Sequence, residues 1–205
     1  MLVKTKAIVI STLKFQEKSL IVKCFTQSHG LKSYFVRNAF SGKKNNQKIA
    51  YFQPLSILEI EAVHKNKGTL EHFKEIKTAI PFQTIHLDIV KSTMVLFLSE
   101  ILHHAIHAEE QNEDLFKYLE TALQWLDTHN ETSNFHLILM LEITKFLGFY
   151  PDTSDQDLPF FEMNEGVFSL FQAISCLSEH ESFLLKKLID LRLRSEEHTS
   201  ELQSP

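Results

Sequence analysis

The stretch SLIVKCFTQSHGLKSYFVRNAF, residues 19–40, contains two predicted β-strands and the turn between them. Residues 19–27 mix polar residues with β-branched and other apolar ones, which is typical of a strand with one buried face. Residues 31–40 add several aromatic side chains, and the Ser-His-Gly triplet at 28–30 is a tight-turn signal. The stretch therefore predicts β-structure at the start of the chain.

Further predicted strands lie on both sides of this stretch. VKTKAIVIST, residues 3–12, alternates polar and apolar residues and is rich in β-branched ones. PLSILEIEAV (54–63) and TLEHFKEI (69–76) predict two more strands, separated by the turn HKNKG (64–68). Five short strands with turns between them indicate a small β-barrel or a sandwich.

The apolar period changes from two to about 3.6 residues after Pro81, which predicts helices. Apolar residues share one helical face over residues 90–105, and Asn112 is placed to cap a second helix. A third helix is predicted to end at Gly148, and a Ser-x-x-Glu capping box precedes the apolar run FLLKKLIDLRL. We therefore expect a helical domain over residues 78–193 that follows a barrel domain over residues 1–77.

The charge is divided unequally between these two parts. Residues 1–77 contain 14 basic and 5 acidic residues, a net charge of +9, whereas the remainder has 7 basic and 21 acidic residues. A basic face attracts polyanions. The division predicts a front domain that binds a polyanion, the alternative being a lysine-rich surface that is merely solvated.

Cations are densest in residues 1–50, which hold ten of them and one acid, Glu17. Four of the ten lie in the loop RNAFSGKKNNQK, residues 37–48, and aromatic residues are interleaved with them. Barrels that bind single strands hold phosphate with lysines while bases stack on aromatic rings. Lys32 and Tyr34 share one face of their strand, so a base could stack on Tyr34 or Phe40, although core packing is the alternative for each ring.

Other classes of protein lack support in the sequence. Cys24 and Cys176 form no Cys-x-x-Cys pair, which argues against a disulfide framework and a cysteine zinc site. The start lacks a signal-peptide pattern, and no apolar run approaches the roughly 20 residues that span a bilayer. No phosphate-binding glycine loop or nucleophile elbow is present. We expect a cytoplasmic protein without catalytic residues or cofactor.

Two polar segments have some features of a metal site. Glu100, His103 and His107 have the helical spacing that can place two imidazoles and a carboxylate on one metal ion, which would suit a metalloenzyme. No Glu follows His103 as in the His-Glu-x-x-His motif, so a solvated face is expected and no metal is predicted. The acidic loop PDTSDQD (151–157) lacks the glycine and glutamate that a calcium-binding loop requires.

The last twelve residues, RSEEHTSELQSP (194–205), have no helical or strand periodicity. They resemble the in-frame translation of a common sequencing adapter, and an ordinary disordered tail is the alternative. We expect residues 194–205 to be a non-native tail and the native chain to be cut near Leu193.

Residues 6–44 resemble the N-terminal region of the bacterial DNA repair and recombination mediator family RecO. The shared features are an alternating strand, a turn with Glu, a phrase of the form F-T-x-x-x-G (25–30) and a strand leading into a basic loop. The Gln-Pro-Leu segment at 53–55, the helical region at 99–127 and the L-G-x-x-P turn within 145–152 follow in the family's order. The resemblance covers residues 1 to about 193.

The resemblance implies an α+β protein, with a five-stranded OB-fold barrel followed by an all-α domain. It implies binding of single- and double-stranded DNA, annealing of complementary strands, and contact with RecR and the single-stranded DNA-binding protein (SSB) to load RecA. It also implies a location at the nucleoid. Many members carry a four-cysteine zinc site after the L-G-x-x-P turn, and this chain departs from them because no cysteine lies in residues 151–168.

On this basis we expect the DNA contacts to come from cations and aromatic rings of the front domain. The predicted DNA-binding residues are Lys6, Lys14, Lys18, Lys23, Lys32, Tyr34, Arg37, Phe40, Lys43, Lys44 and Lys48. The alternative is an OB-fold adaptor that binds RNA or a protein partner and has no annealing activity.

Overall fold

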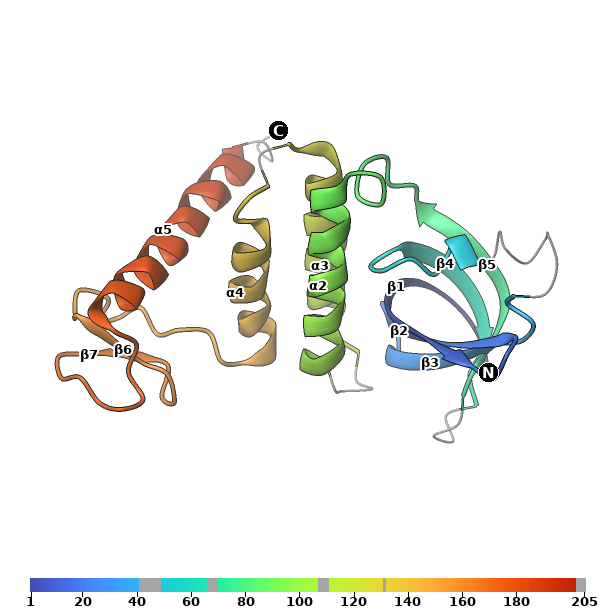
Figure 1. The fold of residues 1–205 in the computed structure, drawn as a ribbon, viewed down its shortest axis with the longest axis horizontal. Coiled ribbons are helices and arrows are strands. Elements are labelled where there is room, and N and C mark those ends of the chain that lie inside the picture. The colour runs from blue at the N-terminus through green and yellow to red at the C-terminus, as the bar shows by residue number, and fades with distance from the viewer. Residues whose placement is uncertain (41–48, 66–69, 107–110, 131, 202–205) are drawn as a thin grey trace. The chain divides into compact units, whose positions relative to one another are not determined.

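Five antiparallel strands at the start of the chain form one sheet in the computed structural model, which describes residues 1–40, 49–65, 70–106, 111–130 and 132–201 (Figure 1). Their order across the sheet is β3-β2-β1-β4-β5. The five predicted strands are confirmed, with ends that differ by a few residues from the prediction. The strands are β1 (Leu2–Phe15), β2 (Ser19–Thr26), β3 (Gly30–Val36), β4 (Ile57–Val63) and β5 (His72–Ile80).

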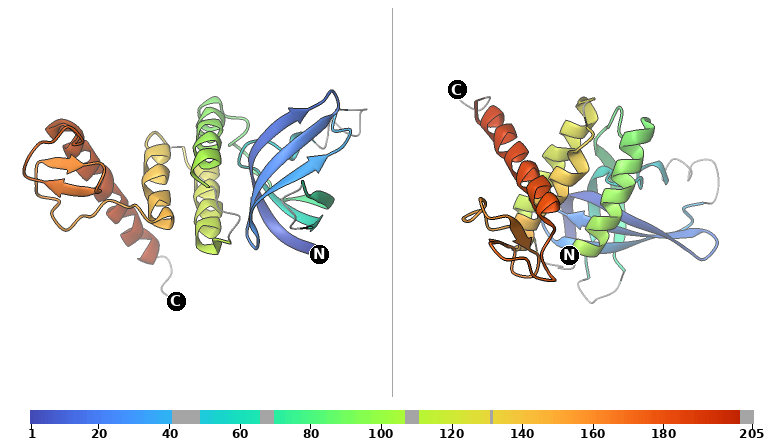
Figure 2. Two further views of the ribbon diagram at one scale, coloured as in Figure 1. Left: turned by 90° about the horizontal axis from the view of Figure 1, so that it is seen from below. Right: turned by 60° about the vertical axis from the view of Figure 1, so that its left-hand side comes forward.

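The sheet closes on itself where β3 meets the residue just before β5. Tyr34 and Glu71 form a parallel bridge, the Phe35 N–H donates to the Glu71 carbonyl at 2.8 Å, and the Glu71 N–H donates to the Ser33 carbonyl at 2.8 Å. Closure removes the free strand edges that would otherwise pair with other chains. The strands curl accordingly in Figure 2. The predicted α+β fold, an OB-type barrel followed by helices, is confirmed.

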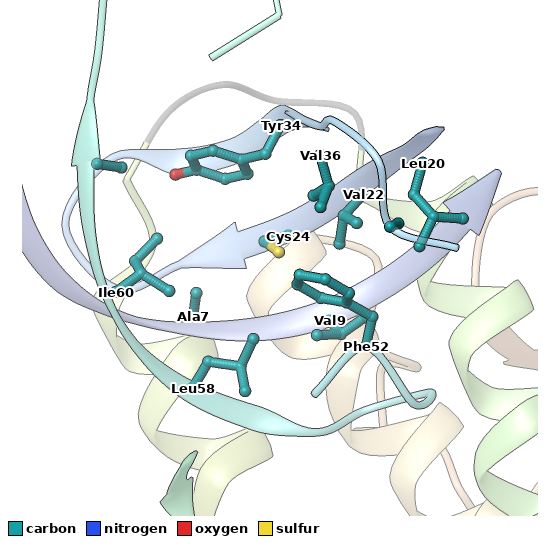
Figure 3. Close-up of a cluster of buried hydrophobic side chains, with 12 residues drawn as sticks. Ala7, Val9, Leu20, Val22, Cys24, Tyr34, Val36, Phe52, Leu58 and Ile60 are labelled. Carbon is teal, nitrogen blue, oxygen red and sulfur yellow. The ribbon is translucent and has the colours of Figure 1, made fainter. Parts of the chain in front are cut away.

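The barrel interior is filled by side chains that point inward from alternate strand positions (Figure 3). The fully buried side chains there include Val22 and Cys24 of β2, Tyr34 of β3 and Ile60 of β4. Phe52, which lies in the segment between β3 and β4, packs among them. Burial raises the pKa of the Cys24 thiol, so the group stays protonated and unreactive. The alternation seen in the sequence is thus the alternation between this core and the outside of the barrel.

A β-bulge interrupts the alternation in β1. Val9 lies opposite Cys24 and points into the core, but the next paired residue, Ser11, lies opposite Lys23, so Ile10 is an extra residue. An extra residue exchanges the two faces of a strand beyond it. Odd-numbered residues after the bulge, such as Leu13, therefore lie on the outer face.

Two helices, α2 (Ile89–Ala105) and α3 (Glu113–Thr128), belong to the same compact unit as the barrel, which spans Met1–Thr132. Phe25 on the outer face of β2 packs against Phe116 of α3, with ring centroids 5.9 Å apart. The predicted cap of α3 is confirmed, because the Asn112 side chain accepts from the Leu115 N–H at 2.9 Å.

The chain between β5 and α2 is fastened to α3 by one carboxylate. Asp127, which is only 9% exposed, accepts hydrogen bonds from the backbone N–H groups of Gln83 (2.9 and 3.0 Å), Thr84 (2.8 Å) and Ile85 (3.0 Å). The buried Lys91 ammonium donates to the Asp127 carbonyl at 3.1 Å and to the Thr84 hydroxyl at 2.8 Å. The compact unit accordingly extends past residue 77, where the predicted domains 1–77 and 78–193 were divided.

The second unit, Ser133–Pro205, consists of α4 (Phe135–Leu147), α5 (Glu179–Glu201) and a small hairpin, β6 (Phe160–Glu162) with β7 (Val167–Ser169). Figure 1 shows the hairpin beside α5. The predicted end of α4 is confirmed, because Gly148 has a left-handed backbone with φ of 82°. The predicted capping box is also confirmed, since the Glu181 carboxylate accepts from the Ser178 N–H at 3.0 Å and the Ser178 hydroxyl oxygen accepts from the Glu181 N–H at 3.3 Å.

The β6–β7 hairpin was not predicted, because strands of three residues are too short to show alternation.

The backbone of α5 continues to Glu201, into the segment predicted to be a non-native tail. No helix within the described ranges is long and apolar enough to cross a membrane.

Candidate nucleic-acid interface

Three of the predicted cations meet at one end of the barrel, around the β1–β2 hairpin. Lys14 lies near the end of β1, opposite Leu20 of β2, and Lys18 lies in the turn that joins the two strands. Arg37 directly follows Val36, whose partner across the strands is also Leu20. Strand pairing therefore brings Arg37 to the same end of the barrel as Lys14 and Lys18, although Arg37 lies much further along the chain.

Phe40 completes this group. Its backbone N–H donates to the Lys18 carbonyl at 3.4 Å, which holds the segment after β3 against the hairpin turn. The Lys14 ammonium lies 5.4 Å from the centre of the Phe40 ring, a cation–π contact. The ring is 39% exposed. We call Lys14, Lys18, Arg37 and Phe40 the hairpin-tip cluster.

The cations of the hairpin-tip cluster make no salt bridge among the residues that the structure describes. Other lysines of the barrel differ, because glutamates on neighbouring positions neutralise them. The neutralised pairs are Lys4–Glu59 (3.2 Å), Lys74–Glu61 (2.6 Å) and Lys77–Glu75 (2.9 Å). Glu17 lies in the hairpin turn beside the hairpin-tip cluster, but it pairs with none of the cluster's cations within the described ranges.

Two other predicted cations, Lys23 and Lys32, lie further along the strands from this cluster. Lys23 lies on the outer face of β2, opposite Ser11 and Ser33. Lys32 lies opposite Cys24, toward the other end of β3. Lys43, Lys44 and Lys48 lie outside the described residues.

Lys6 was predicted to bind DNA, but its side chain is directed to α3. Its ammonium lies 2.6 Å from the Glu120 carboxylate, whose side chain is only 14% exposed. This ion pair joins residues 114 positions apart in the sequence, so no local pattern could indicate it. The pair separates Lys6 from the hairpin-tip cluster and neutralises its charge.

Tyr34 is the clearest correction to the predicted site. Its side chain is fully buried, its ring stacks on Phe73 with centroids 4.1 Å apart, and its hydroxyl is hydrogen-bonded to His64 Nε2 at 2.8 Å. Burial raises the pKa of Tyr34, and the nearby Cys24 and Glu71 raise it further. The prediction that Tyr34 stacks on a base is wrong, because barrel closure places its face of β3 inside the core.

Replacing Tyr34 by Phe should therefore affect stability and leave binding unchanged. The variant loses one buried hydrogen bond, and the free energy of unfolding should fall by about 1–2 kcal/mol. Urea unfolding measures this loss, and fluorescence anisotropy with single-stranded DNA measures binding. A large loss of affinity in a well-folded Tyr34→Phe variant would mean that the Tyr34 hydroxyl contributes to DNA binding.

Sequence reasoning missed a set of apolar side chains on the outside of the barrel. Leu13 is 63% exposed and Phe15 is 41% exposed, although both belong to β1. Leu13 lies opposite Ile21, Ile21 lies opposite Phe35, and the rings of Phe15 and Phe35 meet edge to face with centroids 5.9 Å apart. We call Leu13, Phe15, Ile21 and Phe35 the outer apolar patch. In the sequence, Phe15 lies between the cations Lys14 and Lys18, and this position could have indicated an exposed ring.

The helical segment that contains Glu100 and His103 forms no metal cluster in the part of the chain that the structure describes. Glu100 pairs with His104 at 3.0 Å, and both side chains are largely exposed. His107 lies outside the described residues. This pair lies on the exposed surface of α2, whereas His103 is half-buried.

Comparison with known proteins identifies relatives of both halves of the chain. Residues 1–82 match the family model described as recombination protein O N terminal, and residues 86–201 match recombination protein O C terminal. A protein named DNA repair protein RecO from Flavobacterium johnsoniae is 75% identical over 192 residues, which cover 94% of this chain and 81% of the relative.

More distant relatives carry the same name. The DNA repair protein RecO of Christiangramia forsetii is 42% identical over 190 residues, covering 92% of this chain and 80% of that protein. The one from Phocaeicola vulgatus is 38% identical over 186 residues, covering 90% of this chain and 75% of that protein. The similarity therefore spans the barrel and the helices together.

Proposed function

The chain belongs to the recombination protein O (RecO) family, and we propose that it binds DNA through the hairpin-tip cluster and anneals complementary strands. The observation that carries this proposal is the gathering of Lys14, Lys18 and Arg37 at one end of a barrel, without salt bridges among the described residues. Cations without acidic partners can replace the counterions of a phosphate backbone, and their release drives binding.

Annealing follows from the same electrostatics. Two strands repel each other through their phosphates, and a surface that neutralises both lets the bases approach and pair. Such a protein acts by binding and needs no bond-making residue. We propose that the barrel supplies this surface.

The acidic part of the chain that follows the barrel strands is better suited to contact proteins than DNA. Residues 78–205 carry 7 basic and 21 acidic residues and thus disfavour DNA. We propose that this part contacts RecR and SSB, as the family resemblance implies, and that the chain helps to load RecA on SSB-coated DNA in the cytoplasm, at the nucleoid.

The salt dependence of binding tests the proposal directly. If six to eight phosphates of a single strand are contacted, log K should fall against log salt with a slope of about −4 to −6. Fluorescence anisotropy with a labelled oligonucleotide across a salt series measures the slope. Binding that does not depend on salt, or no binding at low salt, would contradict the proposal.

Competition and annealing assays separate the alternatives. Unlabelled single-stranded DNA, duplex DNA and RNA should compete, with RNA no stronger than DNA, and the chain should accelerate pairing of complementary strands. Strong preference for RNA without annealing would favour the OB-fold adaptor that binds RNA or a protein.

A further inference from the structure

The outer apolar patch occupies a part of the barrel where apolar side chains are unexpected. On the outer face of β1, residues before the bulge, such as Ile8, are fully buried, but Leu13 and Phe15 beyond it are exposed. The outer face of β1 is thus buried before the bulge and exposed beyond it. Contiguous exposed apolar surface on a folded chain often marks a binding site.

Cations without salt bridges among the described residues lie on both sides of this patch. Lys23 is the next outward-facing residue after Ile21 on β2, about 7 Å along the strand. Lys18 and Arg37 lie at the opposite side, beside the hairpin turn. A ligand that crosses the patch therefore meets positive charge, then apolar and aromatic surface, then positive charge again.

The two rings of the patch hold each other in place. Phe15 and Phe35 pack at an interplanar angle of 82°, and Phe35 also contacts the His72 ring edge to face with centroids 6.2 Å apart. Packing of this kind fixes the orientation of Phe15 before any ligand binds, which lowers the entropy cost of binding.

We propose that the outer apolar patch, with Phe15 as its exposed ring, is a stacking surface for unpaired nucleic-acid bases. The inference rests on the proposed DNA binding and deepens it by naming the form of DNA that this face selects. Lys18, Lys23 and Arg37 hold the phosphates on either side, while a base lies against Phe15. Stacking on aromatic rings tolerates any base, because every base has a π face.

This arrangement distinguishes single strands from duplexes. In a duplex the bases are paired and stacked on each other, so none is free to stack on Phe15. A duplex can still place its phosphates against the lysines. Removing the ring should therefore weaken single-strand binding alone, whereas removing the cations should weaken both.

The test compares Phe15→Leu, which removes the ring but keeps an apolar side chain, with Phe15→Tyr, which keeps a ring. Phe171→Leu is the matched control, because Phe171 is 78% exposed and lies in the second unit. The probes are an oligodeoxythymidine of about 15 nucleotides, which one barrel can span, and a blunt duplex of equal length. Thermal unfolding confirms that each variant is folded.

Phe15→Leu should weaken binding to the oligodeoxythymidine about tenfold and change duplex affinity less than about twofold. Phe15→Tyr and Phe171→Leu should bind both probes like the wild type. Equal losses on both probes, or no loss on either, would overturn the stacking role. In either of those cases, a loss of affinity for both probes in variants of the hairpin-tip cations would still support the proposed DNA binding.

A second measurement needs no variant and so does not depend on folding. The unchanged protein should bind the oligodeoxythymidine more tightly, by about tenfold, than the same strand with abasic sites. Both strands carry the same phosphates, so a difference reports on the bases. Equal affinity for the two strands would contradict the stacking surface even if binding remained strong and salt-dependent.

Discussion

Changing Lys14, Lys18 and Arg37 together to alanine is expected to weaken binding of single-stranded DNA about 100-fold at about 0.1 M salt. Each phosphate contact to a single strand contributes about 0.7 to the slope of log K against log salt. Three lost contacts therefore reduce the slope by about two and remove about two decades of affinity at that salt concentration. Fluorescence anisotropy across a salt series measures both quantities.

The barrel offers a matched control with the same change in net charge. Lys4, Lys74 and Lys77 are ion-paired with Glu59, Glu61 and Glu75, so their positive charges are already neutralised locally. The triple alanine variant of these lysines should bind DNA much more tightly than the variant of the hairpin-tip cations. Equal losses in the two triple variants would mean that net charge alone governs binding, and the hairpin tip would then have no special role.

Replacing Asp127 by Ala is expected to lower the free energy of unfolding by about 4 kcal/mol, because it leaves one buried and two partly buried backbone donors without an acceptor. The backbone N–H groups of Gln83, Thr84 and Ile85 all donate to this one carboxylate. Each buried donor left unsatisfied costs about 1–3 kcal/mol. The buried Lys91 would also lose a nearby negative charge.

The contribution of Asp127 should depend on pH. Burial raises the pKa of its carboxyl group, but the hydrogen bonds from Gln83, Thr84 and Ile85 outweigh burial and hold that pKa below its ordinary value. A lowered pKa in the folded state means that the carboxylate stabilises the fold fully above the unfolded pKa of about 3.9. This stabilisation is lost as the pH falls through the folded pKa.

Urea unfolding at neutral pH and in acid measures this effect. The difference in stability between the wild type and Asp127→Ala should be largest at neutral pH and should shrink below about pH 3.9. Asp155→Ala is the control, because Asp155 is exposed in a loop. A loss in Asp127→Ala no larger than that in Asp155→Ala would mean that the carboxylate does not fasten the connection between β5 and α2.

Much of the fold could be predicted because its signals are local. The caps at Asn112, Gly148 and Ser178 each use a side chain or backbone conformation within a few residues of the helix end. Strand positions followed from alternation within each segment. The division of charge between the front and the rear needed only a count along the sequence.

The candidate site was harder to predict, because long-range contacts decide which charges remain available. Lys6 and Lys14 look alike in the sequence, yet Lys6 pairs with Glu120 of α3 while Lys14 lies over the Phe40 ring. Tyr34 and Lys32 share one face of β3, as predicted. Closure of the barrel buries Tyr34 on that face, whereas Lys32, nearer the strand end, is only partly buried.

The sequence by itself determined a basic set of β-strands followed by acidic helices, because alternation, capping and charge are properties of neighbouring residues. Only the tertiary structure decided which way Leu13 and Phe15 point. Unbroken alternation in β1 would place both with Val9 in the core, but the extra residue Ile10 fits the strand to the register of β2 and turns them outward. A bulge forms where two strands pair, so it depends on both strands and cannot be read from either one alone.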